Sequence, residues 1–205
     1  MAPDQLLERL EDATRYELVI AGSLPPAWLA AATALRHVVI PFAGVPLRFR
    51  EALAPYPDLA IYSSHYNAAF TAEHAWALLL AAAKRIVPAD RALRQNDWSM
   101  RYDGFPSVLL HGRTLLLLGY GEIGQCLGRM GKAFGMRVWA VKRTPGQAPE
   151  IDRLALPSEL LQLLPEADAI MLTLPETTTT TGILNADAFA CMKDGVLLVN
   201  VGRGP

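Results

Sequence analysis

The sequence predicts an α/β protein that combines a doubly wound parallel sheet with a second, smaller α/β domain. The first observation is the segment Thr114–Gly124, TLLLLGYGEIG, in which four leucines run into a glycine-rich turn and a helix-like pattern follows. The second is the alternation of strand-like and helix-like segments from about residue 88 onward, which is the rhythm of βαβ units. The third is that Ala169–Leu174 and Val196–Val201 are almost continuously apolar, as expected for parallel strands covered by helices on both faces.

Residues 1–87 are expected to form the smaller domain from short α/β units. Its strand-like segments are residues 17–21, 37–41 and 59–63. A helix is expected at Pro25–Leu35, because proline suits the first turn of a helix. A longer helix is expected from Thr71 to about Gln95, with a kink or break at Pro88, because proline inside a helix removes a backbone hydrogen bond.

Residues 88–205 are expected to form the larger domain. Its strand-like segments are residues 114–118, 136–141, 169–174 and 196–201. Helices are expected after the glycine turn and near residues 157–164 and 186–192. The threonine run Thr177–Thr181 lies between two of these elements and predicts a loop.

Composition excludes several classes of function. Hydrophobic residues make up 52% of the chain and charged residues 19%, which supports a buried core. The net charge is −1 without a basic cluster, so we expect no nucleic-acid partner. The longest apolar run, Ala75–Ala83, is too short to span a bilayer, and the N-terminus lacks a signal-peptide pattern. Cys126 and Cys191 form no CxxC pair, so we expect a reducing, cytoplasmic setting and no metal site.

The glycine motif predicts a dinucleotide site, because it ends an apolar strand and begins a helix that leads to a second strand. Gly119 permits a tight turn, Gly121 lets the backbone approach a pyrophosphate, and Gly124 lets the helix pack on the strand. Glu122 and Ile123 lie in the first turn of that helix, whose free N–H groups attract phosphate. The alternative is a glycine-rich turn without a ligand.

The end of the second strand indicates which nicotinamide cofactor binds. An NAD site usually carries Asp or Glu about 20 residues after the glycine motif, where it accepts hydrogen bonds from the ribose 2′-hydroxyl. This chain has Lys142, Arg143 and Thr144 there, and these side chains would attract a 2′-phosphate. The sequence therefore favours NADP over NAD. The alternative is a solvated basic strand end that accepts either cofactor.

Several further segments support a family resemblance. GYGEIG, LTLPETTTTTGILNADAFACMKDG and VLLVNVGRGP, together with PFAGV, YNAAFTAEHAWALLL and NDW in the same order, resemble the D-isomer-specific 2-hydroxyacid dehydrogenases. The resemblance covers most of the chain from about residue 17. It implies a Rossmann domain paired with a smaller flavodoxin-like substrate domain, both incomplete here. It also implies a homodimer that acts on small 2-oxo or 2-hydroxy acids.

The resemblance also assigns roles to particular residues. Arg203 matches the arginine that binds the substrate carboxylate and polarises its carbonyl. Ala43, Gly44 and Val45 match the loop whose N–H groups hold that carboxylate, and Asn67 matches a cleft-facing asparagine, although a turn-forming role also fits. The cofactor-binding set that the resemblance adds is Leu174, Pro175, Thr180, Val201 and Gly202.

The implied reaction is hydride transfer between NAD(P)H and a 2-oxo acid. The family's proton-transferring histidine and its glutamate partner follow the NVGRG segment, and the chain stops two residues after Arg203. We therefore expect a truncated Rossmann domain and an inactive or impaired enzyme in this form. The alternative is a non-catalytic nucleotide-binding relative that dimerises or senses redox state.

Overall fold

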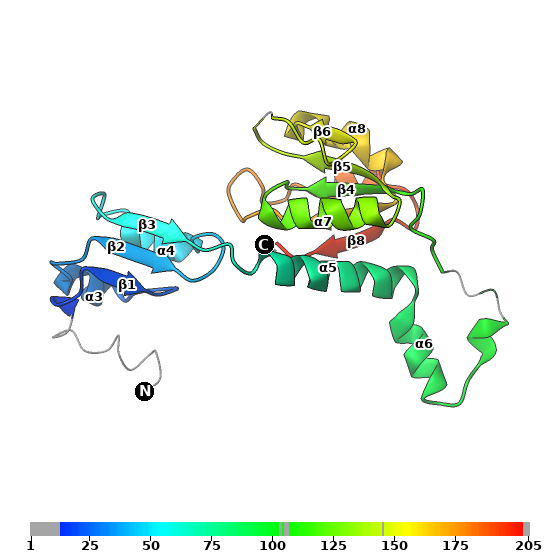
Figure 1. Cartoon of the computed structure of the whole chain (residues 1–205), viewed down its shortest axis with the longest axis horizontal. Coiled ribbons are helices and arrows are strands. Elements are labelled where there is room, and N and C mark those ends of the chain that lie inside the picture. The colour runs from blue at the N-terminus through cyan, green and yellow to red at the C-terminus, as the bar shows by residue number, and fades with distance from the viewer. Residues whose placement is uncertain (1–12, 103, 105–106, 145, 203–205) are drawn as a thin grey trace. The chain divides into compact units, whose positions relative to one another are not determined.

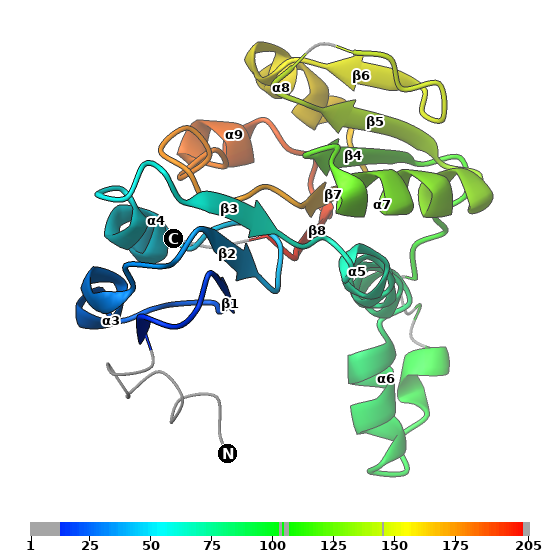
Figure 2. The same cartoon turned by 60° about the vertical axis from the view of Figure 1, so that its left-hand side comes forward.

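The structure is a computed structural model that describes residues 13–102, 104, 107–144 and 146–202. The chain divides into two compact units, Met1–Asn67 and Ala68–Pro205. Figures 1 and 2 show the elements of each unit.

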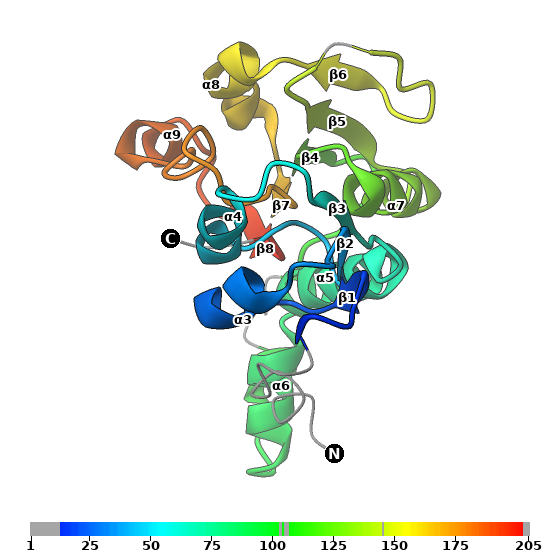
Figure 3. The same ribbon diagram turned by 90° about the vertical axis from the view of Figure 1, so that its left-hand side faces the viewer.

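The first unit contains a three-stranded, all-parallel sheet in the order β1-β2-β3. Its strands are β1 (Leu18–Ile20), β2 (His37–Ile40) and β3 (Ala60–Ser63). The helices α3 (Pro26–Ala31) and α4 (Leu47–Leu53) lie on the same side of this sheet (Figure 3). The core of the unit contains side chains of both helices and the inward-facing residues of β2, namely Trp28, Leu29, Val38, Ile40, Phe49 and Leu53. We did not predict α4, because its seven residues carry three charges and show no clear apolar period.

The second unit contains a five-stranded, all-parallel sheet in the order β6-β5-β4-β7-β8. Its strands are β4 (Thr114–Leu118), β5 (Arg137–Val141), β6 (Arg153–Ala155), β7 (Ala169–Leu172) and β8 (Leu197–Asn200). The order matches the first five strands of a Rossmann sheet, 3-2-1-4-5, which confirms the predicted fold class. We did not predict β6, which is three residues long and begins with a charged residue.

Helices cover both faces of this sheet (Figure 3). On one face lie α5 (Ala68–Ala83) and α7 (Glu122–Ala133), which pack on Leu115 and Leu117 of the central strand. On the other face lie α8 (Leu160–Leu163) and α9 (Ala186–Ala190), which pack on Leu116 and Leu118. In the described part of the unit, short 3-10 turns lie at Ser99–Arg101, Pro157–Glu159 and Leu164–Glu166. The apolar run of β4 is therefore buried on both sides, as expected for the centre of a parallel sheet.

The boundary between the units lies before α5, whereas we expected it between residues 87 and 88. Trp76 and Leu79 of α5 are buried in the same core as Leu115 and Leu127 of the second unit. Because α5 packs on α7 and β8, it belongs to the second unit.

The break in the long helix also differs from the expectation. Helix α5 ends at Ala83, and α6 (Ile86–Leu93) begins after Arg85, whose φ of 51° is left-handed. Pro88 is the third residue of α6 rather than the site of the break. Proline is tolerated in the first turn, because the N–H group that it lacks has no partner within the helix there.

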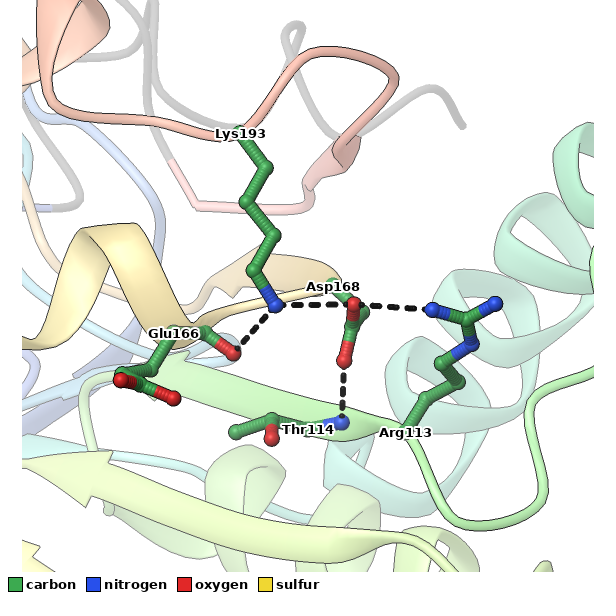
Figure 4. A network of polar contacts seen from close by, with 5 residues as sticks. All are labelled: Arg113, Thr114, Glu166, Asp168 and Lys193. Carbon is green, nitrogen blue, oxygen red and sulfur yellow. Dashed lines mark hydrogen bonds and ion pairs between the residues drawn. The ribbon is translucent and has the colours of Figure 1, made fainter.

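A network of charges ties together the N-terminal ends of β4 and β7 and the loop before β8 (Figure 4). The Asp168 carboxylate accepts hydrogen bonds from the Thr114 N–H at 2.8 Å and from Lys193 Nζ at 3.0 Å. It also pairs with Arg113 at 3.4 Å. Burial alone would raise the pKa of Asp168, but these hydrogen bonds and the two cationic charges outweigh it and lower the pKa below its usual value.

In the part of the chain that the structure describes, no helix combines the length and the apolar character that crossing a membrane requires.

Candidate functional site

The segments that follow four neighbouring strands of the second unit lie side by side. The Gly119 N–H, after β4, donates to the Val141 carbonyl at the end of β5, at 3.0 Å. On the other side of β4, the Thr173 N–H donates to the Leu118 carbonyl at 2.9 Å, and the Val201 N–H donates to the Leu172 carbonyl at 3.1 Å. In an open parallel sheet, this carboxyl-terminal edge is where ligands bind.

The glycine turn after β4 has a shape that only small residues allow. Gly119 has a φ of 102°, and a Cβ atom there would lie 2.7 Å from Thr173 Oγ1. A Cβ atom on Gly124 would collide with the Gly119 carbonyl oxygen. Gly121 differs from both, since a Cβ atom there would meet no atom of the described residues within 4 Å. The backbone at Gly121 is therefore open to a ligand that approaches it closely.

Helix α7 begins at this opening. Gly121 is its N-cap and provides no side-chain hydrogen bond to the first turn, so the amino end is free to receive an anion. The Glu122 side chain is exposed, while Ile123 packs against the core. These residues can hold a pyrophosphate by their backbone N–H groups, so the site fits a dinucleotide.

Tyr120, the first of the three variable residues of the motif, has its side chain in the core and away from this opening. Its side chain is buried, and its ring lies 3.3 Å from the position of a Cβ atom on Gly128. Burial raises the pKa of its phenol, the charge of Glu150 adds to this rise, and the charge of Arg129 opposes it. Tyr120 therefore packs under α7 and is unsuited to touch a bound ligand.

The basic segment after β5 lies next to the glycine turn. Lys142, Arg143 and Thr144 are exposed and directly follow Val141, whose carbonyl accepts the Gly119 N–H. The Lys142 N–H donates to the Ala155 carbonyl of β6 at 3.0 Å, which places this backbone at the same edge of the sheet. No carboxylate occurs between residues 142 and 149.

The segment after β7 forms a pocket at the same edge. Its lining residues are Leu172, Leu174, Pro175, Glu176, Thr180, Thr181, Ile183 and Asn200. Thr180 Oγ1 donates to the Pro175 carbonyl at 2.6 Å and accepts the Thr177 N–H at 2.9 Å, so the threonine run forms a closed turn. The run is a loop, as predicted.

The segment after β8 packs on this loop. A Cβ atom on Gly202 would lie 2.5 Å from the Leu174 carbonyl oxygen, so glycine is required there. The Gly202 N–H donates to Asn200 Oδ1 at 2.9 Å, and Val201 packs against the core. Arg203, the predicted substrate-binding arginine, lies outside the described residues.

The other predicted substrate-binding residues lie in the first unit. Ala43, Gly44 and Val45 follow β2 in a loop in which Gly44 is exposed and has a φ of 77°. Asn67 is half-buried and ends the segment that follows β3. At the start of this segment, the Ser64 N–H donates to the Ile40 carbonyl at 3.1 Å. The loop and this segment therefore both begin at the carboxyl-terminal edge of the first sheet.

Two residues at the larger site were missed in the sequence, Thr173 and Asn200. Each follows or ends an apolar strand as its first polar residue, and each makes a side-chain hydrogen bond to the backbone of a loop at the site. A polar residue at the end of an apolar strand was the sequence signal that could have identified both.

Comparison with known families gives one extended match. Residues 76–205 match the family model described as D-isomer specific 2-hydroxyacid dehydrogenase, NAD binding domain. The match includes all five strands of the second unit and every predicted cofactor-binding residue.

Individual relatives agree with this match. The chain is 39% identical over 139 residues to a glyoxylate reductase of Aeropyrum pernix, in an alignment that covers 65% of this chain and 42% of the relative. It is 33% identical over 203 residues to a D-3-phosphoglycerate dehydrogenase of Mycobacterium tuberculosis, in an alignment that covers 98% of this chain and 38% of the relative. The chain thus spans about two fifths of the length of these curated relatives.

Solved structures show the same fold. A D-isomer specific 2-hydroxyacid dehydrogenase family protein from Aeromonas salmonicida superimposes with a TM-score of 0.79 and 28% identity, covering 95% of this chain and 62% of that chain. D-Mandelate dehydrogenase from Rhodotorula graminis superimposes with a TM-score of 0.81 over 100% of this chain and 65% of its own. Its identity is 21%, so it supports the fold alone.

Proposed function

Because this chain belongs to the D-isomer specific 2-hydroxyacid dehydrogenase family, we propose that the protein transfers a hydride between NAD(P)H and a small 2-oxo or D-2-hydroxy acid. The observation that carries this proposal is the glycine turn. It leaves Gly121 and the amino end of α7 open, while Gly119 and Gly124 are tightly packed.

The residues of the larger site have complementary roles in this proposal. The N–H groups at the start of α7 bind the pyrophosphate, and Leu174, Pro175 and Thr180 support the rest of the cofactor. When bound, the cofactor supplies the hydride. In this proposal, Arg203 binds the substrate carboxylate through its planar guanidinium and polarises the carbonyl. The N–H groups of Ala43–Val45 are the proposed substrate-binding groups of the first unit.

We propose that residues 1–205 by themselves bind cofactor without appreciable turnover, because the family's proton-transferring histidine follows the NVGRG segment and all four histidines of this sequence precede it. Two of the four histidines have structural contacts. His37 lies against Tyr62, with ring centroids 5.9 Å apart, and the His111 ring packs on Gly135. The test is NADPH oxidation with glyoxylate and hydroxypyruvate, using residues 1–205 and the protein encoded by the whole gene. Turnover by the shorter polypeptide would refute this proposal. Cofactor binding without turnover in both would support a non-catalytic relative.

NADP(H) is the proposed preferred cofactor. The support is that Lys142, Arg143 and Thr144 are exposed beside the glycine turn, where a carboxylate would repel a 2′-phosphate. Each charge-assisted hydrogen bond contributes about 1.5–3 kcal/mol, or roughly tenfold or more in affinity.

The experiment compares kcat/KM for NADPH and NADH in the unmodified protein and in Lys142→Asp. The substitution should shift the ratio toward NADH by about tenfold or more. Arg137→Asp is the matched control, because Arg137 is exposed at the opposite end of the same strand. Equal or better use of NADH by the unmodified protein would refute the preference.

A homodimer is also proposed, formed through the arm between α5 and β4. The base of the arm is closed by two hydrogen bonds, from the Val108 N–H to the Ala83 carbonyl at 2.8 Å and from Lys84 Nζ to the Val108 carbonyl at 2.9 Å. None of the described arm residues between 84 and 107 is buried. The arm nevertheless presents large apolar side chains, namely Ile86, Val87, Leu93, Trp98 and Tyr102. Figures 1 and 2 show α6 extending away from α5 and the sheet of its own unit. An apolar arm without a core of its own is typical of an interface.

Sedimentation velocity tests the arm as an interface. Leu93→Asp should convert the dimer to a monomer, because it places a charge in an apolar contact. Leu161→Asp is the control, since Leu161 lies on α8 and is similarly exposed, at 50% against 46% for Leu93. Equal sedimentation of both variants and the unmodified protein would exclude the arm from the interface.

A further inference from the structure

The carbonyl group of Gly119 makes an unusual set of contacts for a residue in a ligand-binding turn. The hydroxyl of Thr173 donates to this carbonyl at 3.1 Å and also lies 3.3 Å from the Leu118 carbonyl. On the other side, the Cα of Gly124 packs so closely on the same oxygen that no Cβ atom fits. The Gly119 oxygen is therefore held between the end of β7 and the first turn of α7.

The hydroxyl extends the sheet by one interaction. The β4–β7 ladder continues past Leu172 with the Thr173 N–H, which donates to the Leu118 carbonyl at 2.9 Å. The next carbonyl along the chain is that of Gly119, just past the end of β4, and it accepts a hydrogen bond from the Thr173 side chain. On the opposite side, the Gly119 N–H is bound to Val141 of β5 at 3.0 Å. Both peptide groups that flank Gly119 are thus oriented by neighbouring strands.

The orientation of these peptide groups matters for the residues that follow. Gly121 is the open position of the turn and the N-cap of α7, and only Tyr120 separates it from Gly119. A rotation of the Gly119–Tyr120 peptide would change the direction of the N–H groups at the start of α7. Preorganised donors bind more tightly than donors that must be ordered by the ligand.

We propose that Thr173 is a positioning residue for the cofactor, which holds the glycine turn in its pyrophosphate-binding conformation through the Gly119 carbonyl. This inference rests on the proposed dinucleotide binding. The pyrophosphate is common to both nicotinamide cofactors. Loss of the Thr173 hydroxyl therefore weakens the binding of NADPH and of NADH by the same factor. Lys142→Asp, in contrast, changes the affinity for NADPH relative to the affinity for NADH.

The experiment measures Kd for NADPH and NADH by nicotinamide fluorescence in Thr173→Val, Thr173→Ser and Thr114→Val. Valine keeps the shape of threonine and removes the hydroxyl that the Gly119 and Leu118 carbonyls share, so both cofactors should bind about threefold to tenfold more weakly. Serine keeps the hydroxyl and should restore Kd to within about twofold. In steady-state assays of the whole protein, Thr173→Val should raise KM for the cofactor and leave kcat unchanged.

Thr114→Val is the matched control. Thr114 begins the same strand β4 at its other end, and its buried hydroxyl has no hydrogen-bond partner among the residues that the structure describes. This substitution should leave both Kd values unchanged. The proposal is overturned if Thr173→Val binds both cofactors normally, if serine fails to restore binding, or if Thr114→Val weakens binding equally. Absence of dinucleotide binding by the unmodified protein would instead refute the proposed function, and the role of Thr173 with it.

Discussion

Replacing Asp168 by asparagine tests the charge network at the N-terminal ends of the strands. The Asp168 side chain is only 14% exposed, whereas Lys193 and Arg113 are 39% and 53% exposed. Each partly exposed ion pair therefore contributes only about 0.2–1 kcal/mol. The larger contribution is the hydrogen bond from the Thr114 N–H, because a charged acceptor is worth about 1 kcal/mol more than the neutral oxygen of asparagine. Asp168→Asn should lower the free energy of unfolding of the second unit by about 2 kcal/mol at pH 7.

The effect should depend on pH in a defined direction. The pKa of Asp168 is lower in the folded protein than in the unfolded chain, whose value is about 3.9. The carboxylate therefore stabilises the fold fully above about pH 5, and this stabilisation is lost as the pH falls through the folded pKa. The difference between the unmodified protein and Asp168→Asn should be constant between about pH 5 and pH 8 and should shrink below about pH 4.

Urea denaturation followed by tryptophan fluorescence measures this difference. Trp28 is the one tryptophan of the first unit, so a Trp28→Phe background confines the signal to the second unit. Asp194→Asn is the control, because Asp194 is exposed and adjacent to Lys193 but takes no part in the network of Figure 4. Equal stability of Asp168→Asn and the unmodified protein at pH 7 would refute the reasoning. A difference that persists unchanged to pH 3 would refute the assigned pKa direction.

Two further predictions concern single contacts in the second unit. Gly124→Ala should destabilise the protein by about 1–3 kcal/mol and weaken cofactor binding, because its Cβ atom meets the Gly119 backbone. Gly131→Ala should lower the free energy of unfolding by less in the same urea titration, because its Cβ atom meets only the side chains of Val138 and Leu115. Alanine also favours a helix over glycine. Equal losses of stability in Gly124→Ala and Gly131→Ala would contradict this. Asn185→Ala should lower stability by about 1 kcal/mol, because Asn185 Oδ1 caps α9 by accepting the Ala188 N–H at 2.9 Å. Asn185→Asp retains the acceptor and should cost little, so an equal loss in both variants would exclude the cap as the cause.

Much of the site could be predicted because it consists of backbone at strand ends. Gly119, Gly121 and Gly124 identify the turn after β4, since each tolerates no larger side chain or leaves space for a ligand. The apolar runs likewise predicted β4, β5, β7 and β8 to within two residues at each end. The roles of Lys142 and Arg203 stay predictions.

Tertiary packing decided the features that short-range patterns cannot encode. The sequence of residues 68–83 predicts an apolar helix but does not indicate which unit the helix packs on. Its contacts with α7 and β8 assign it to the second unit. β6 is a strand because β5 supplies its hydrogen bonds, and its three residues alone show no period. The Thr173 hydroxyl donates to the carbonyl of Gly119, which lies 54 positions away in the chain. The sequence by itself thus determined the elements with a strong apolar period and the glycine turn, because these depend on neighbouring residues. The three-dimensional structure decided domain membership, the edge strand and the hydrogen bonds that orient the turn, because these depend on residues that only folding brings together.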